Sequence, residues 1–337
     1  MMRVHAGRKA LAVLAVAFAC AVLASLLPAN DYQRWQMLDG TIHKNARWIY
    51  ERSHFDPAPI DVAFVGPSRV GAAVSAPRLS RELAALGLPS NVVNFSLPEQ
   101  GRNINAVIVE QMLADKRPRL LVIGVIEKPG RFGHSAYKYI APASDMANPR
   151  YPLNLNYLSD LIYLPYRQLV LLAAEVLPQA MGMPKAFDPA DYRGSVVETG
   201  GDVLLPDGSI KNGTQPASME ELERGVNKLR QGAGGPLLPP ALADWEFGDE
   251  RGNIRRIVAM ARAKGVPVAF LALPYFTGPP TLQEQRLYES YGPVWNAAFL
   301  APHAEWYCDY GHLTADAAQL FTDWLAPRVA AELEKRR

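Results

Sequence analysis

The sequence has little cysteine and little net charge, and each shortage excludes a class of protein. Only two of the 337 residues are cysteines, Cys20 and Cys308 near the two ends of the chain, so we expect no disulfide framework and no Cys-x-x-Cys metal site. The formal charge is +2, but three basic residues and no acid lie in residues 1–30, which leaves −1 for the rest. Such a body lacks the clustered Lys and Arg of nucleic-acid-binding proteins, and we expect no nucleic-acid partner.

Several other signals are also missing from the sequence. It has no internal repeat, no low-complexity tract, and no Gly-Lys-Ser or Gly-Lys-Thr after Gly130-x-x-Gly133 that would make a phosphate loop. No group of histidines and carboxylates has the spacing of metal ligands, so we expect neither a metal nor a cofactor. The composition, with 49% hydrophobic and 20% charged residues, is that of a globular protein.

The apolar run Ala10–Leu27 predicts an N-terminal membrane anchor. Its 18 residues would span about 27 Å as a helix, close to the thickness of a bilayer's hydrocarbon core. The basic residues Arg3, Arg8 and Lys9 precede it and favour a cytoplasmic N-terminus. We therefore expect a single-pass protein of the inner (cytoplasmic) membrane with a periplasmic or other extracytoplasmic body. A cleaved signal peptide, with secretion of the rest, and a buried helix of a soluble protein remain as alternatives.

Short apolar segments alternate with amphipathic ones in two parts of the chain. The segments predicted as strands are Ile60–Val65, Asn91–Phe95, Arg119–Val125 and Val266–Leu273. The segments predicted as helices are Ala76–Leu86, Ile104–Ala114, Asn253–Lys264 and a last helix from Thr314. This alternation predicts a three-layer α/β/α fold around a mostly parallel sheet.

The domain organisation follows from where this pattern holds. Residues 31–59 are expected to be a connecting segment, and residues 60–337 to be one α/β domain. Prolines and tyrosines become frequent and the alternation is lost in residues 128–249, so we expect a large irregular insertion there. Within it, Pro206-Asp207-Gly208 predicts a hairpin turn, and Met219–Arg230 predicts a polar helix.

Two short motifs bear residues suited to nucleophilic catalysis. Gly66-Pro67-Ser68-Arg69 directly follows the first strand, at the sheet edge where ligands bind in open parallel sheets. Asp309-Tyr310-Gly311-His312 precedes the last helix and offers, on one loop, a base and the carboxylate that orients it. Each motif alone has a structural alternative, because Ser68 is also a good helix cap and His312 suits a solvated loop.

Together the two motifs resemble the SGNH (GDSL-like) hydrolase superfamily. After the second strand that family has an Asn-x-Ser-x-x-Gly type loop, matched here by Asn94-Phe95-Ser96 and, with about two extra residues, by Gly101. After the third strand the family carries an Asn whose side chain stabilises the oxyanion, but Ile126 stands in its place. The loss of one such donor costs on the order of 3–4 kcal/mol of transition-state stabilisation.

The resemblance implies a serine enzyme of acyl transfer. Ser68 would be the nucleophile, His312 the base, Asp309 the residue that orients it, and the N–H groups of Ser68 and Gly101 the oxyanion hole. The missing Asn, the anchor and the insertion are features that resemble a membrane-associated branch of this superfamily. That branch includes alginate O-acetyltransferase-like proteins and the teichoic acid D-alanyl transfer protein.

That branch implies O-acylation, with acetyl favoured, of a cell-envelope polysaccharide or exopolysaccharide. A membrane-bound O-acyltransferase partner would supply the acyl groups. Two alternatives stay open: an extracytoplasmic carbohydrate esterase or deacetylase with the same triad, and a catalytically degenerate protein that binds or assembles polysaccharide.

Four further residues are candidates for substrate binding. Arg69 stands beside the proposed nucleophile, where it would hold an anionic or polyhydroxylated substrate, unless it forms a surface salt bridge. Tyr275 follows another strand and would stack on a sugar, unless it packs in the core. Asn94 lies at the end of the second strand, and Glu127 follows the third.

Overall fold

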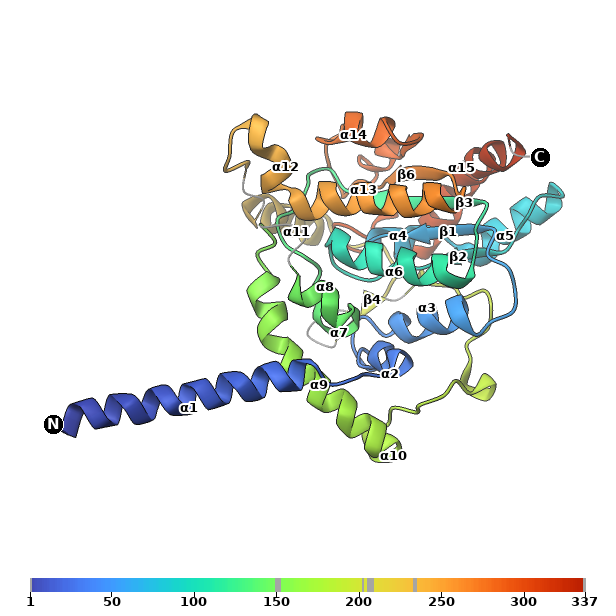
Figure 1. Cartoon of the computed structure of the whole chain (residues 1–337). Coiled ribbons are helices and arrows are strands. Elements are labelled where there is room, and N and C mark those ends of the chain that lie inside the picture. Colours follow the sequence, from blue (N-terminus) through green and yellow to red (C-terminus); the bar gives the residue numbers. More distant parts are fainter. Residues whose placement is uncertain (1, 149–152, 202, 205–208, 233–234, 336–337) are drawn as a thin grey trace.

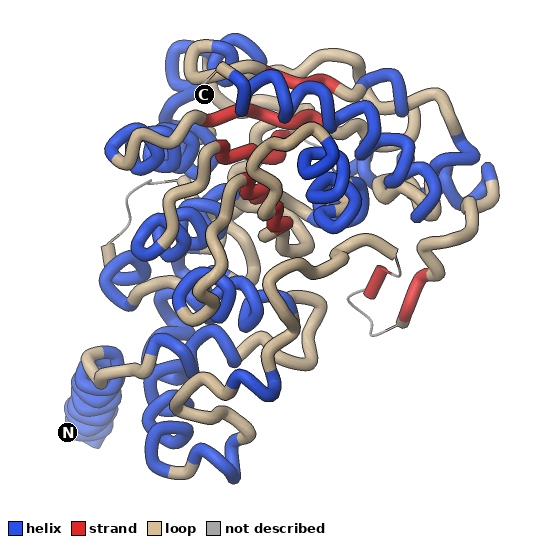
Figure 2. Tube along the Cα trace, turned by 90° about the vertical axis from the view of Figure 1, so that its right-hand side faces the viewer, coloured by secondary structure: helices blue, strands red, loops and turns tan. Residues whose placement is uncertain are grey.

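The computed structural model describes residues 2–148, 153–201, 203–204, 209–232 and 235–335. At its centre is a five-stranded sheet in which all neighbouring strands are parallel (Figures 1 and 2). The strands in sheet order are β2 (Val92–Asn94), β1 (Val62–Val65), β3 (Leu120–Val125), β6 (Val268–Ala272) and β7 (Val294–Asn296). The strand order reverses between β1 and β3, and ligands bind at such a switch point in open α/β sheets. The prediction of an α/β fold with a parallel sheet is confirmed.

Helices cover both faces of the sheet. On one face lie α3 (Asn45–His54), α6 (Arg102–Asp115) and α13 (Gly248–Ala263). On the other lie α4 (Ser68–Ala73), α5 (Ala76–Ala85) and α15 (Ala315–Glu334). Successive strand side chains serve the two cores in turn, as the two-residue period of a strand requires: Ala63 and Val65 join the first core, and Val62 and Phe64 the second.

Residues 31–59 do more than connect. They form α2 (Asp31–Gln36) and α3, and α3 packs against α6 as part of a covering layer. Trp35 and Trp48 are fully buried in the first core. Residues 31–59 thus both connect α1 to the first strand and cover one face of the sheet, because a short amphipathic helix has the same sequence pattern in either role.

The described part of the stretch 128–249 contains several helices, so it is less irregular than the sequence predicted. Its helices are α7 (Tyr137–Ile140), α8 (Ala143–Ala147), α9 (Tyr157–Val176), α10 (Pro178–Met181), α11 (Met219–Gly232) and α12 (Ala243–Glu246). An antiparallel pair, β4 (Val203–Leu204) and β5 (Ile210–Lys211), lies between α10 and α11. The helix predicted at Met219–Arg230 is confirmed, whereas the predicted turn Pro206-Asp207-Gly208 lies outside the described residues. Pro165 sits inside α9, which shows why frequent proline was a poor guide here.

A few short elements complete the chain. They are α14 (Gln285–Glu289) and the 3₁₀ segments Pro189–Asp191, Pro240–Leu242, Ala298–Leu300 and Ala304–Trp306. The predicted start of the last helix is confirmed to within a residue, because the Thr314 hydroxyl accepts a hydrogen bond from the N–H of Ala317 and so caps α15.

The N-terminal helix α1 (Met2–Ser25) projects from the body of the protein (Figure 1). Large apolar side chains along it are exposed, among them those of Leu14 and Phe18. Within the described part of the chain, no helix combines the length and the apolar character needed to cross a membrane.

Candidate active site

The two motifs that are 244 residues apart in sequence meet in the structure. The Nε2 atom of His312 lies 2.7 Å from the Oγ atom of Ser68. Its Nδ1 atom lies 2.7 Å from Oδ2 of Asp309. A serine, a histidine and an aspartate are thus joined in the order that nucleophilic catalysis needs, with the imidazole between the hydroxyl and the carboxylate.

Ser68 is positioned by the end of β1 and by the loop of β2. It is the first residue of α4, directly after Pro67, at the carboxyl end of the strand. Asn94 holds this short helix, because its amide nitrogen donates to the carbonyls of Val70 and Val74, both at 3.0 Å. Asn94 is 1% exposed and its amide oxygen accepts from Ser96. The prediction that Asn94 binds substrate is corrected: its polar atoms are used inside the protein.

The loop of Asp309 and His312 is shaped by its own aspartate. Oδ1 of Asp309 accepts hydrogen bonds from the N–H groups of Gly311 and His312, at 2.7 and 2.8 Å. Burial alone would raise the pKa of Asp309, but the hydrogen bonds and positive potential of His312 and these N–H groups outweigh it and lower the pKa below its usual value. The carboxylate therefore stays ionised at neutral pH, as is required to hold an imidazolium.

Ser68 and His312 open into a cavity of about 450 Å³. Its walls come from segments far apart in the sequence: the turn before α3, the loop after β2, the stretch after the 3₁₀ segment Pro189–Asp191, and the Asp309–His312 loop. The residues that line it besides the triad include Lys44, Ser96, Glu99, Arg193, Thr199 and Tyr310. The volume lies within the range of small-molecule sites in proteins.

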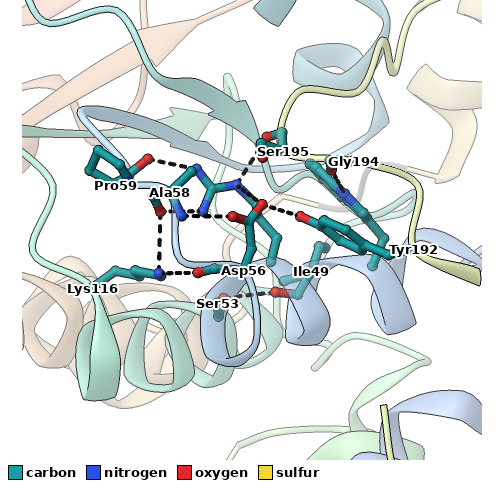
Figure 3. A network of polar contacts seen from close by, with 11 residues as sticks. Ile49, Ser53, Asp56, Ala58, Pro59, Lys116, Tyr192, Gly194 and Ser195 are labelled. Carbon is teal, nitrogen blue, oxygen red and sulfur yellow. Dashed lines mark hydrogen bonds and ion pairs between the residues drawn. The ribbon is translucent and has the colours of Figure 1, made fainter. Parts of the chain in front are cut away.

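The wall formed by residues 193–201 is fastened to the core. The hydroxyl of Thr199 donates to the carbonyl of Gly71 in α4 at 2.9 Å, and Ser75 donates to the carboxylate of Glu198. Upstream, the buried Arg52 of α3 donates to the carbonyl of Ser195 at 2.9 Å (Figure 3). The wall is therefore held from both of its ends.

The same network joins α3 to the start of this wall. Tyr192 donates from its hydroxyl to Asp56 at 2.5 Å, and the indole N–H of Trp48 donates to the carbonyl of Gly194 at 2.9 Å (Figure 3). Arg52 also donates to the carbonyls of Ala58 and Pro59. Sequence reasoning missed these residues, because no local pattern pairs an arginine with carbonyls more than 140 residues away.

Gly101 stands where only a glycine fits. Its φ is +146°, and an added Cβ would lie 2.2 Å from the backbone nitrogen of His134. Gly101 borders a small cavity shared with Pro67 and Ile126, next to the one that holds Ser68. Its N–H as an oxyanion donor remains a prediction. Ile126 places an apolar side chain at the end of β3, where the family resemblance would have an amide.

A cluster of two histidines and a glutamate supports the Pro98–Gly101 loop. Ligand atoms of His43, Glu99 and His134 lie within 4.8 Å of one another, although the three residues are far apart in the sequence. In His134, however, Nδ1 accepts the N–H of Ala136 at 3.0 Å and Nε2 lies 2.6 Å from the carbonyl of Pro98. Both ring nitrogens are thus used within the protein, which leaves no lone pair for a metal.

The charges of this cluster suit a structural role. The nearby His43, whose Nε2 atom lies 3.6 Å from Oε2 of Glu99, is the main reason that the pKa of Glu99 falls to about 2. Burial lowers the pKa of His134 to about 4. At neutral pH Glu99 is therefore ionised and His134 neutral. Glu99 has a positive φ of 71°, a strained conformation that these contacts maintain beside the cavity.

Arg69, Glu127 and Tyr275, predicted separately, form one buried group. Nη1 of Arg69 donates to Glu127 at 2.8 Å and to the carbonyl of Leu273 at 3.3 Å. The guanidinium also lies over the ring of Tyr275, 5.4 Å from its centroid. The prediction that Arg69 holds an anionic substrate is corrected, because its charge is already paired. Tyr275 is 7% exposed and packs in the second core.

A second cavity, of about 600 Å³, shares Tyr310 as a lining residue with the first. Glu127 and Tyr275 line it together with Ile126, Arg131, Lys228 and Arg230. Tyr310 belongs to both cavities, between Asp309 and His312 in sequence. Two spaces of substrate size thus adjoin the loop that holds the base.

The fold and the site define an α/β protein with a Ser-His-Asp constellation at the carboxyl edge of a parallel sheet. No known family model matches the chain, and no curated protein matches it significantly. The function is therefore argued from the geometry.

Proposed function

We propose that this protein is an SGNH-like serine O-acyltransferase. The observation that carries the proposal is the hydrogen-bonded series from Ser68 through His312 to Asp309, with Ser68 opening into a cavity. The position of the serine after β1, at the switch point of the sheet, also supports it.

The reaction would proceed in two balanced steps. Ser68 Oγ attacks the acyl carbonyl while its proton passes to Nε2 of His312, and the proton then goes to the departing oxygen, which leaves an acyl-Ser68 ester. In the second step His312 takes the proton of an acceptor hydroxyl, which attacks the ester, and returns it to Ser68 Oγ. Asp309 stabilises the imidazolium in both steps.

Transfer is favoured over hydrolysis because two cavities adjoin the same loop. One would hold the acyl donor at Ser68, and the other, which shares Tyr310 with it, would hold a sugar acceptor. In our proposal the acceptor is a polysaccharide of the cell envelope, as the resemblance to the membrane-associated SGNH branch implies. The acyl group, acetyl in our proposal, would come from a membrane-bound O-acyltransferase partner.

We also propose that α1 attaches the protein to the cytoplasmic membrane, with the body on the extracytoplasmic side. The apolar run Ala10–Leu27 and the three basic residues before it support this topology. The exposure of the apolar side chains of α1, apart from the body, agrees with such a contact.

The test uses the full chain in detergent, an activated acetyl ester as donor, and an oligosaccharide acceptor. Ser68→Ala should abolish formation of the acyl-enzyme, which in wild type is seen as an added acetyl mass. Ser290→Ala, a change at an exposed serine far along the chain, is the matched control and should leave the mass shift intact. Equal activity in Ser68→Ala and wild type would refute the assignment.

The acceptor then separates the candidates. Acetylated oligosaccharide identifies a transferase, and free acetate alone identifies an esterase or deacetylase. The apolar Ile126 in place of an oxyanion amide specifically favours a third function, a polysaccharide-binding protein without catalysis. That function would show oligosaccharide binding without any acyl-Ser68.

A further inference from the structure

The helix α9 buries several polar side chains while it exposes a set of large apolar ones. Arg167 is fully buried, and Asp160 and Gln168 are 3% and 2% exposed. Ile162 is 76% exposed and Leu158 is 68% exposed. A helix on the surface of a soluble body has the opposite arrangement, with its apolar stripe against the core.

The exposed apolar residues form one continuous stripe. They recur every three or four positions over the whole length of α9, so they share one face of the helix. The members of the stripe are Leu158, Ile162, Tyr166, Leu169, Leu172 and Val176. Leu177 and Met181 extend it into α10. Exposed apolar areas of this length mark an interaction surface.

The orientation of α9 is set by its inner face. Nη1 of Arg167 donates to the carbonyl of Ala141 at 2.7 Å, and Leu171 and Ala174 pack in a small core with Met183. The amide of Gln168 donates to the carbonyl of Leu27, just past the end of α1. A rotation that hid the stripe would leave Arg167 and Gln168 without these partners, so the outward apolar face is a stable feature.

The stripe continues the apolar surface of α1. The two helices contact each other, and α1 leaves the body beside α9 (Figure 1). A bilayer that receives α1 is therefore next to α9 as well. Tyr163 and Tyr166 stand on α9, with the ammonium of Lys138 over the ring of Tyr163, and tyrosine and lysine are typical of membrane interfaces.

We propose that α9 lies on the membrane surface with its apolar stripe in the boundary between headgroups and acyl chains. This inference rests on the proposed attachment through α1, and it commits to lipid as the occupant of the stripe. A helix with one apolar face and few charges outside binds at this depth without spanning the bilayer. The body would then have one fixed orientation on the membrane instead of swinging on α1.

The test places an environment-sensitive fluorophore at single cysteines in the full chain, reconstituted in vesicles of phosphatidylcholine with a minority of phosphatidylglycerol. Native Cys308 is buried, and burial raises the pKa of its thiol to about 12, so only introduced or exposed thiols react. The labelled variants are Ile162→Cys and Leu169→Cys in a Cys20→Ala background. The matched control is Leu320→Cys, an exposed leucine on α15.

Brominated phosphatidylcholine should quench both α9 labels and leave the Leu320→Cys label bright, while aqueous iodide should do the reverse. Quenching of the α9 labels by iodide would overturn the inference, and protection from both quenchers would show a protein partner and overturn it too. A label on native Cys20 tests the anchor separately: lipid quenching there with none at α9 refutes only this inference. A Cys20 label without lipid quenching refutes the anchor.

Discussion

Asp309→Asn should inactivate the proposed enzyme while leaving its fold in place. The aspartate makes three hydrogen bonds, two from Oδ1 to backbone N–H groups and one from Oδ2 to Nδ1 of His312. Asparagine keeps the first two with its carbonyl oxygen. The amide NH₂ of asparagine would face Nδ1 of His312. Nδ1 must then accept a hydrogen bond, so the ring proton moves to Nε2. In that tautomer His312 donates to Ser68 and no longer serves as its base.

The magnitudes separate the effect on catalysis from the effect on stability. The wrong tautomer costs on the order of 10⁴-fold in kcat, or about 5 kcal/mol. The loss of one charge-assisted hydrogen bond costs only about 1.5–3 kcal/mol of unfolding free energy. Asp309→Ala removes all three hydrogen bonds and should destabilise the loop further without being less active than Asp309→Asn.

The assay is acetyl-ester turnover per folded molecule, with thermal unfolding measured on the same samples. Asp316→Asn makes the same chemical change at an exposed aspartate in the first turn of α15 and should retain near wild-type turnover. Turnover of Asp309→Asn within a few-fold of wild type would refute the role given to the carboxylate, and so would equal losses in both variants.

Three further predictions concern stability and can be followed by denaturant unfolding. Gly101→Ala should lower the free energy of unfolding by several times the ~1 kcal/mol expected of Gly87→Ala. Both glycines have a positive φ, but only at Gly101 would an added Cβ lie 2.2 Å from a neighbouring backbone nitrogen. Similar losses of stability in the two variants would contradict this close approach. Glu127→Ala should lower the free energy of unfolding by about 3–5 kcal/mol, because it leaves the buried charge of Arg69 without its ion-pair partner. The double variant Arg69→Leu with Glu127→Leu should recover much of this stability. Additive effects in the double variant would show that the pair is not coupled. Burial raises the pKa of Asp160 to about 7, so the folded state holds this proton more tightly than the unfolded state and loses stability as pH rises from about 4 to 7. Asp160→Asn should remove this loss and raise the free energy of unfolding by up to about 4 kcal/mol at pH 8. A pH profile of stability like that of wild type would refute the prediction.

The parts of the site that sequence reasoning predicted are those with local signals. Ser68 follows a strand at a Gly-Pro turn, and Asp309 and His312 share one loop before a capped helix. The strand topology places Ser68 at the carboxyl edge of the sheet, whereas the Asp309–His312 loop follows β7 only after two 3₁₀ segments. The pairing of the two motifs was predicted from the resemblance to the SGNH superfamily, and the 2.7 Å between Nε2 of His312 and Oγ of Ser68 agrees with it.

The parts that were missed depend on contacts between distant segments. Asn94 and Arg69 carry polar groups suited to a ligand, and nothing nearby in sequence indicates that α4 and Glu127 already use them. The helical content of residues 137–181 was hidden for another reason. In α9 both polar and apolar residues are buried and further large apolar residues are exposed, so the apolar pattern of the sequence does not mark the face that packs against the protein.

The division between predicted and missed residues is also a division between chemistry and specificity. The atoms that would make and break bonds belong to two short motifs, whereas the cavity around them is walled by Lys44 from the turn before α3 and by residues 193–201. The wall of residues 193–201 is held by two hydrogen bonds. Thr199 donates to a carbonyl of α4, and Arg52 donates to the carbonyl of Ser195. Because the wall is attached to the helix that bears Ser68, a change in its length or sequence alters the shape of the substrate site while the triad stays in place. We therefore expect the identity of the acyl donor, which we place in this cavity, to depend on this stretch and not on the motifs that indicate the reaction.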